Sequence, residues 1–110
     1  MADLTGLGLL RNDPELAARL IAAAEQGDMD AQYAAGLIYA EGRGVQPDPA
    51  QAYFWLTQAM EQGDSDAELL RQHVGAQMTD EQFAEGRRLV ALAKSMAQNS
   101  MAVQGKRSLH

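Results

Sequence analysis

Two short acidic clusters are the first features of this sequence that could do chemistry. The stretches GDMD and GDSD, at residues 27–30 and 63–66, alternate aspartate with another residue, as calcium-binding loops do. A loop of the EF-hand type also needs a central glycine and a closing glutamate, and neither occurs at the required spacing. We therefore expect these aspartates to cap helix N-termini, where their charge complements the helix dipole.

The histidines and glycines do not form a recognisable ligand site. His73 and His110 are the only histidines, and there is no cysteine that could complete a zinc site with either of them. The sequence therefore predicts no metal and no cofactor, and it predicts His73 on the surface. The glycine pairs GLG and GRG, which begin at Gly6 and Gly42, lack the following lysine and serine of a phosphate-binding loop. We interpret them as turns between helices.

Three consecutive aromatic residues, Tyr53, Phe54 and Trp55, could be a platform for stacking nucleic-acid bases. Successive residues of a helix point about 100° apart, so the three rings cannot form one surface. Trp55 is expected in the core, and Phe54 is expected to pack on an adjacent helix. The serines have no histidine and acid paired with them as a catalytic triad requires. We predict no catalytic residue and no enzyme activity.

The charges are distributed unevenly along the chain. Residues 1–85 carry all fifteen acidic residues and four arginines, whereas residues 86–110 carry five basic residues and no acid. An acidic body repels phosphate backbones, so we expect no nucleic-acid binding and a protein or peptide partner with a basic surface. No apolar run could span a membrane, and the first fifteen residues lack the pattern of a signal peptide. We therefore expect a cytoplasmic protein.

The chain nearly repeats itself at an interval of thirty-six residues. Residues 22–31 read AAAEQGDMDA and residues 58–67 read QAMEQGDSDA, with seven of the ten positions identical. Intervals of this size are typical of stacked supersecondary units. The match extends upstream to Gly6 and Gly42, so we expect the chain to begin partway into a repeat. Its alanine and leucine content favours closely packed helices.

Local signals mark the ends of the predicted helices. An aspartate followed by proline, at residues 13–14 and 48–49, begins a helix, and glycines such as Gly63 end one. Ser65 is expected to cap the fourth helix. The linkers are short except for EGRGVQPD, so consecutive helices should be antiparallel neighbours. The five predicted helices cover residues 13–26, 29–41, 48–62, 65–77 and 79–98.

Apolar positions on these helices form stripes that can pack together. On the third helix the stripe contains Trp55 and Leu56, and Gly36 on the second helix would let a neighbouring backbone approach closely. The third stripe is completed by Ala52 and Ala59, the second is Ala31, Ala35, Ile38 and Tyr39, and the last is Phe83, Gly86, Leu89, Val90, Ala93 and Met96. We predict an all-α fold, a short α/α solenoid of about five antiparallel helices.

Residues 31–67 closely resemble the Sel-1-like repeat, a relative of the tetratricopeptide repeat. The residues that match the family pattern are Ala31, Gly36, Tyr39, Gly42, Gly44, Val45, Asp48, Ala52, Trp55, Ala59, Gly63 and Ala67. The resemblance implies one domain over residues 1–98, with one full repeat at about 29–63. A flexible tail is expected at 99–110.

Both flanking units depart from the family pattern. Arg19 stands where the repeat has Trp55, and Gln72 and Gly75 stand thirty-six residues after a glycine and a tyrosine. These departures indicate degenerate half-repeats at either end, as expected of terminal units that face water.

The resemblance implies a non-catalytic adaptor or scaffold that binds a protein or peptide on its concave helical face. The predicted binding strip lies on the second and fourth helices, opposite the core, and consists of Tyr33, Leu37, Glu41, Leu69, His73 and Gln77. Packing of Tyr33 and Leu37 against flanking helices is the alternative for those two residues. A regulatory or assembly subunit of an enzyme complex is the alternative for the protein, and the exposed solenoid ends leave a homodimer open.

Overall fold

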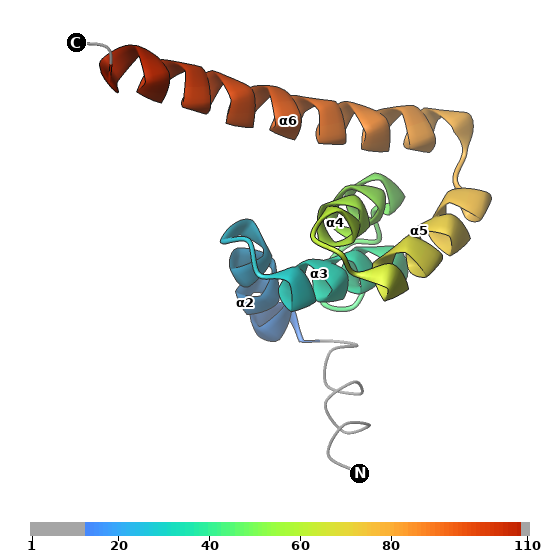
Figure 1. Ribbon diagram of the computed structural model, residues 1–110. Helices are drawn as coiled ribbons and strands as arrows, with labels where there is room; N and C mark the ends of the chain where they lie inside the picture. Colours follow the sequence, from blue (N-terminus) through green and yellow to red (C-terminus); the bar gives the residue numbers. More distant parts are fainter. Residues whose placement is uncertain (1–12, 109–110) are drawn as a thin grey trace.

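The protein is a stack of α-helices. The computed structural model describes the backbone of residues 13–108 and the side chains of residues 13–99, so the expected glycine turn at residues 6–8 and His110 lie outside the description. The helices are α2 (Pro14–Glu25), α3 (Met29–Glu41), α4 (Pro49–Glu61), α5 (Ser65–Gln77) and α6 (Asp80–Ser108). They stack as successive hairpins, and no strand occurs between residues 13 and 108 (Figure 1). The predicted all-α solenoid is confirmed.

Aspartate side chains cap the first four of these helices. The caps are Asp13, Asp28, Asp48 and Asp64, whose Oδ1 atoms accept hydrogen bonds from the amides of Leu16, Ala31, Gln51 and Ala67. The predicted cap at Ser65 is wrong, because the Asp64 carboxylate already satisfies the amide of Ala67 at 3.1 Å and Ser65 is the first helical residue. At the start of α6, Thr79 and Gln82 form a reciprocal capping box, in which each side chain accepts a hydrogen bond from the other residue's amide.

Helix α4 is the centre of the core. Trp55 and Leu56 are adjacent in sequence and pack in different clusters, on two sides of α4. Leu56 is fully buried and Trp55 is 8% exposed, as the stripe predicted. The first cluster is Ala52, Leu56, Ala59, Ala67 and Val74. The second is Ala24, Ala31, Ala35 and Trp55, against which Phe54 packs.

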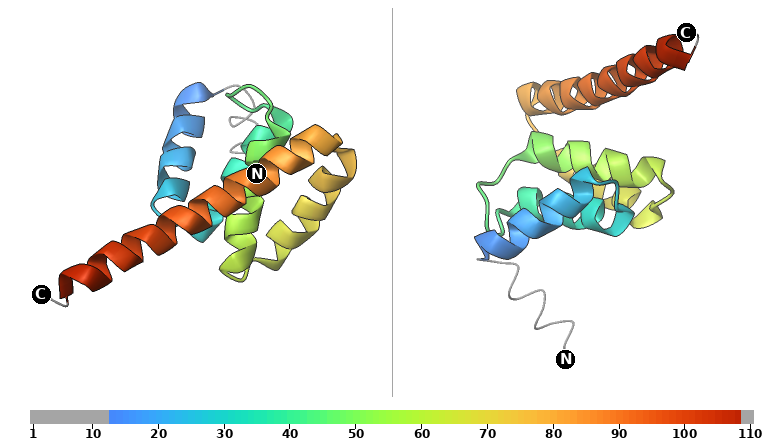
Figure 2. Two further views of the ribbon diagram at one scale, coloured as in Figure 1. Left: turned by 90° about the horizontal axis from the view of Figure 1, so that it is seen from above. Right: turned by 90° about the vertical axis from the view of Figure 1, so that its left-hand side faces the viewer.

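Helix α6 does not complete a second hairpin with α5. It starts beside the end of α5 and crosses over α4. Helices α5 and α6 diverge from their junction (Figures 1 and 2). Packing is consequently extensive between α6 and α4 and slight between α6 and α5. The short linker predicted antiparallel neighbours, and this part of the prediction is wrong. Gly86 lies against Tyr53 of α4, where an added Cβ would come within 2.9 Å of the ring.

The predicted end of the last helix is also wrong. We expected α6 to stop near residue 98, but its backbone continues to Ser108. The sequence beyond residue 98 contains no proline, and its single glycine, Gly105, is not enough to end the helix. Part of the predicted stripe is uncovered: Phe83, in the first turn of α6, is 37% exposed and Met96 is 62% exposed.

Candidate protein-binding surface

Helices α3 and α5, which carry the predicted binding strip, lie near each other and line shared hollows at both ends (Figure 1). At their N-terminal ends Asp30 and Tyr33 of α3 share a hollow of about 220 Å³ with residues of α5. At their C-terminal ends Ala40 shares a second hollow, of about 180 Å³, with Val74 and Gln77. Of the strip residues, Tyr33 lines the first hollow and Gln77 lines the second.

The strip residues differ in how far they reach solvent. Leu69 is 66% exposed, and Glu41, His73 and Gln77 are also exposed. Tyr33 and Leu37 are half-buried, and Tyr33 packs against the core cluster around Leu56. Much of the Tyr33 ring therefore packs inside the protein, as the alternative for this residue predicted, whereas the side chain of Leu69 is available to a partner.

The fold brings the two acidic clusters together. Asp30, Asp64 and Asp66 line the same hollow as Tyr33, although they come from repeats thirty-six residues apart. Asp64 is committed as the cap of α5, while Asp30 and Asp66 are exposed in the first turns of their helices. The side chains described include no group of three or more acids or histidines arranged to hold a metal ion. The hollow instead presents negative charge beside an aromatic ring.

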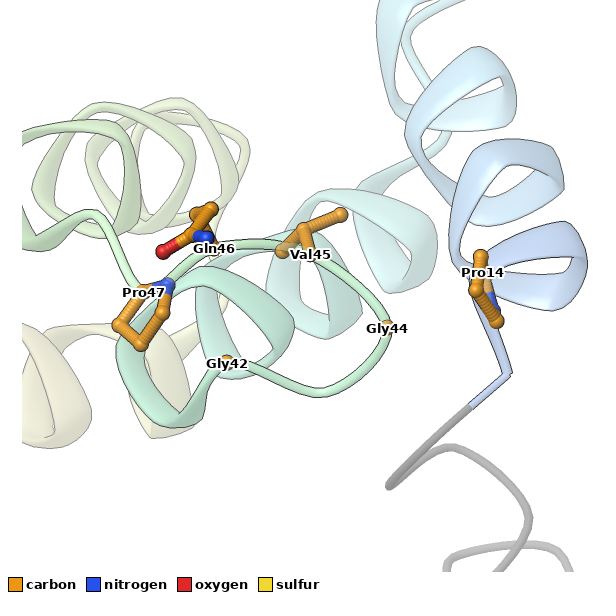
Figure 3. A pocket seen from close by; sticks show the side chains of 6 residues that line it. All are labelled: Pro14, Gly42, Gly44, Val45, Gln46 and Pro47. Carbon is orange, nitrogen blue, oxygen red and sulfur yellow. The ribbon is translucent and has the colours of Figure 1, made fainter.

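The glycine loop between α3 and α4 borders a larger hollow, of about 440 Å³, which sequence reasoning treated only as a turn. It is lined by Pro14, Gly42, Gly44, Val45, Gln46 and Pro47, so the loop faces the start of α2 (Figure 3). Gly44 has a φ of 85°, and a Cβ there would lie 2.7 Å from the carbonyl oxygen of Asp13. Glycine is therefore required by both conformation and space. The hollow carries no charged side chain among its lining residues, so we treat it as a structural joint.

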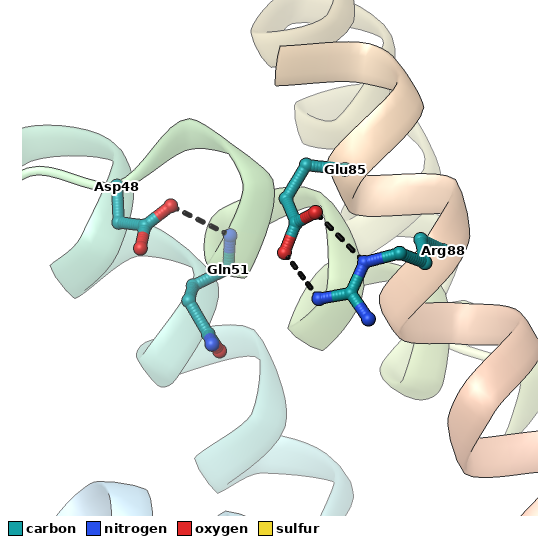
Figure 4. Close-up of polar contacts among 4 residues, drawn as sticks. All are labelled: Asp48, Gln51, Glu85 and Arg88. Carbon is teal, nitrogen blue, oxygen red and sulfur yellow. Dashed lines mark hydrogen bonds and ion pairs between the residues drawn. The ribbon is translucent and has the colours of Figure 1, made fainter. Parts of the chain in front are cut away.

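The ionisable groups with shifted pKa values have structural causes. Burial raises the pKa of Tyr39, and the negative charges of Asp48 and Glu25 raise it further. On α6 a two-pronged hydrogen bond from Arg88 lowers the pKa of Glu85 (Figure 4). Figure 4 also shows Asp48 capping α4 through the amide of Gln51. Tyr39 lies near the end of α3 and Glu85 pairs with Arg88 within α6, so these groups do not converge on a reacting centre.

A wedge between α5 and α6 is the feature that sequence reasoning missed. It has a volume of about 290 Å³ and is lined by Tyr53, Arg71, Gln72, Gly75, Ala76 and Phe83. The available signal was the departure from the repeat at Gln72 and Gly75, which indicated a degenerate unit but not a cavity.

The comparisons with known proteins agree with this geometry. The Sel1 repeat model matches residues 1–28 and 30–64, which is more than half of the chain. The chain belongs to the Sel1 repeat family. Sel1 repeats are generally protein–protein interaction modules without catalytic activity. Within residues 13–108, no helix of this Sel1 protein combines the length and apolarity needed to cross a bilayer.

A relative with an assigned process is the alginate biosynthesis protein AlgK of Azotobacter vinelandii. It is 34% identical to this Sel1 chain over 71 residues. The match covers 64% of this chain but 15% of AlgK, so the chain corresponds to a small part of that relative.

Proposed function

We propose that this protein is an adaptor or scaffold that binds a partner protein or peptide along the face formed by α3 and α5. The observation that carries the proposal is the position of Leu69. This large apolar side chain is 66% exposed on α5, three residues after the exposed Asp66. Asp66 shares a hollow with the exposed Asp30 of α3, at one end of the strip. An accessible apolar anchor with a charged rim is typical of a protein-binding surface.

The charge of this face favours a basic partner. Asp30, Asp64 and Asp66 meet at one hollow, and the first 85 residues carry far more acidic than basic residues. Complementary charge speeds association and selects against acidic competitors. A segment that places an apolar side chain on Leu69 and a lysine or arginine in the acidic hollow would satisfy both features.

Affinity purification from the host with matched variants tests this proposal. Leu69→Ala and the double variant Asp30→Asn, Asp66→Asn should each reduce capture of the same partner. Glu68→Gln is the control, because it removes one exposed charge from α5 outside the strip. Equal capture by the wild type and the strip variants would refute a role for this face, provided that circular dichroism shows all of them folded.

A second candidate is an assembly or regulatory subunit of a biosynthetic enzyme complex. The likeness to an alginate biosynthesis protein supports it, because that relative belongs to a biosynthetic process. Such a subunit should co-purify with one enzyme at fixed stoichiometry. An adaptor should instead recover several proteins in varying amounts, and quantitative mass spectrometry separates these outcomes.

We also propose that copies of the chain associate through α6 at the open end of the stack. Leu92 and Met96 are 48% and 62% exposed on this helix, whereas the neighbouring Ala93 and Ala97 line a hollow shared with α4. Terminal units of a solenoid that expose apolar side chains favour association with a further unit.

A further inference from the structure

The wedge between α5 and α6 has a cause in the sequence. In the first hairpin, Gly36 of α3 lets Leu56 of α4 approach closely. Thirty-six residues later the corresponding position of α5 is Gln72, whose side chain lines the wedge instead of admitting a neighbour. Gly75 stands at the position of Tyr39, so the large ring that packs against the core in the first unit is missing in the second. The result is a cavity where a hairpin interface would have formed.

One wall of the wedge holds Arg71 in a fixed position. Its guanidinium carbon lies 5.2 Å from the centre of the Tyr53 ring, and its Nη1 donates a hydrogen bond of 3.1 Å to Oγ1 of Thr57. The Thr57 hydroxyl donates its own hydrogen to the carbonyl of Tyr53 at 2.7 Å, so it can only accept from Arg71. The ring and the hydroxyl together orient the guanidinium before any ligand arrives.

The charge of Arg71 is not neutralised by the described part of the chain. The ion pairs formed by side chains of residues 13–99 involve Arg19, Arg43 and Arg88, and none reaches Arg71. A guanidinium has five N–H donors, and Thr57 uses one of them. The remaining donors suit a carboxylate, which arginine binds through two parallel hydrogen bonds.

Apart from Arg71 and Gln72, the lining of the wedge is mainly apolar. The rings of Tyr53 and Phe83 lie 5.2 Å apart, and Gly75 and Ala76, about one turn after Arg71 on α5, complete the lining. The nearest atom to a Cβ added at Gly75 would be Cε2 of Phe83 at 3.8 Å, so space remains above the glycine. A ligand in the wedge would therefore place an apolar group against Phe83 and a negative charge on Arg71.

We propose that the wedge binds an internal glutamate or aspartate of a partner protein, together with an apolar side chain next to it in the partner's sequence. Helices α5 and α6 diverge from their junction (Figure 2). Gln72, Ala76 and Phe83 line the wedge and are exposed, so a segment of a partner can reach it. The acidic body of the protein disfavours a polyacidic partner, so one carboxylate is preferred to several. This inference rests on the proposed role in protein binding, but it concerns a surface separate from the α3–α5 strip.

Titration of the ¹⁵N-labelled full chain with a matched peptide pair tests the proposal. The probe is acetyl-Phe-Glu-amide, and the control is acetyl-Phe-Gln-amide, which has the same shape without the charge. We expect saturable chemical-shift changes of the Arg71 Nε–H and Gly75 amide signals. The affinity for the glutamate peptide should be at least about tenfold higher than that for the glutamine peptide, because the glutamine peptide cannot form the charge-assisted hydrogen bond to Arg71. Equal affinities would overturn the proposal.

Two variants locate the site. Arg71→Gln should abolish the preference for glutamate over glutamine, and Gly75→Leu should fill the wedge and weaken both peptides. Gly75→Leu replaces a helical glycine by a better helix former, so it keeps the test valid if Arg71→Gln fails to fold. Unchanged glutamate binding in folded Gly75→Leu would overturn the proposal.

A third peptide tests whether the wedge prefers the side-chain carboxylate of an internal residue or the free carboxylate at the C-terminus of a chain. Acetyl-Ala-Phe with a free C-terminal carboxylate should bind more weakly than acetyl-Phe-Glu-amide, and the reverse order would overturn the proposal for an internal acid. Glu68→Gln, an exposed position of α5 outside both the strip and the wedge, should leave all peptide affinities unchanged. Failure of the α3–α5 strip in affinity purification and failure of the wedge in titration are therefore separate results.

Discussion

The side chain of Leu56 occupies the space that a Cβ on residue 36 would need. An added Cβ would lie 2.5 Å from both Cγ and Cδ2 of Leu56, well inside van der Waals contact. Leu56 is fully buried, so it has little room to move away. The glycine therefore sets the distance between α3 and α4, and α4 in turn supports α5 and α6.

Gly36→Ala should destabilise the fold despite the higher helix propensity of alanine. Overpacking of this kind costs about 1–3 kcal/mol, which exceeds the propensity gain of about 1 kcal/mol. Urea denaturation followed by circular dichroism measures the change. Gly75→Ala is the matched control: its Cβ would meet only Phe83 at 3.8 Å, so this variant should gain about 0.5–1 kcal/mol. Changes of the same sign in the two variants would contradict the steric explanation.

Gln32→Leu should destabilise the junction of three helices. Gln32 is 6% exposed, and its side chain donates to the carbonyl of Ala24 at 3.2 Å and accepts from Nε2 of Gln62 at 2.7 Å. Loss of a buried, bonded amide costs about 1–3 kcal/mol. Thermal unfolding should show a lower midpoint, whereas the exposed Gln98→Leu on α6 should leave it unchanged. A midpoint unaffected by Gln32→Leu would mean that the leucine compensates fully by apolar burial.

Tyr39 should make the fold sensitive to alkaline pH. Burial and the charges of Asp48 and Glu25 raise the pKa of Tyr39 above its ordinary value of 10.0. The unfolded chain therefore loses this proton first, so the stabilisation is complete below pH 10.0 and is lost as the pH rises through the folded-state pKa. Tyr39→Phe should remove this component of the alkaline loss of stability. Absorbance titration at about 295 nm should show one tyrosine ionising late, and that late step should disappear in the variant.

Self-association through α6 should depend on its two exposed apolar side chains. Sedimentation equilibrium should give an average mass that rises above 11.9 kDa with increasing concentration. Leu92→Glu combined with Met96→Glu should hold the mass at the monomer value, because charge disfavours burial at an interface. The exposed Ala91→Glu on the same helix is the control and should behave as the wild type. A monomer at every concentration would refute association through this helix.

Much of the local structure could be predicted because its causes lie close together in the sequence. Aspartate caps and proline or glycine boundaries placed the first four helices to within one residue at each end. The period of the apolar residues placed Trp55 and Leu56 in the core. The candidate strip was predicted only in part: the exposure of Leu69 and the half-buried state of Tyr33 depend on how closely α3 and α5 approach, which periodicity does not determine.

By itself, the sequence determined the repeat, the helices and the residues that face their common core, since these follow from capping and from the 3.6-residue period. Only the tertiary structure decided where α6 lies. Its crossing over α4 places Gly86 against Tyr53, and Gln72 of α5 lines the wedge that remains between α5 and α6. The wedge results from that crossing, and the orientation of Arg71 results from the packing of α5 on α4. Both require contacts among side chains that the linear pattern does not bring together.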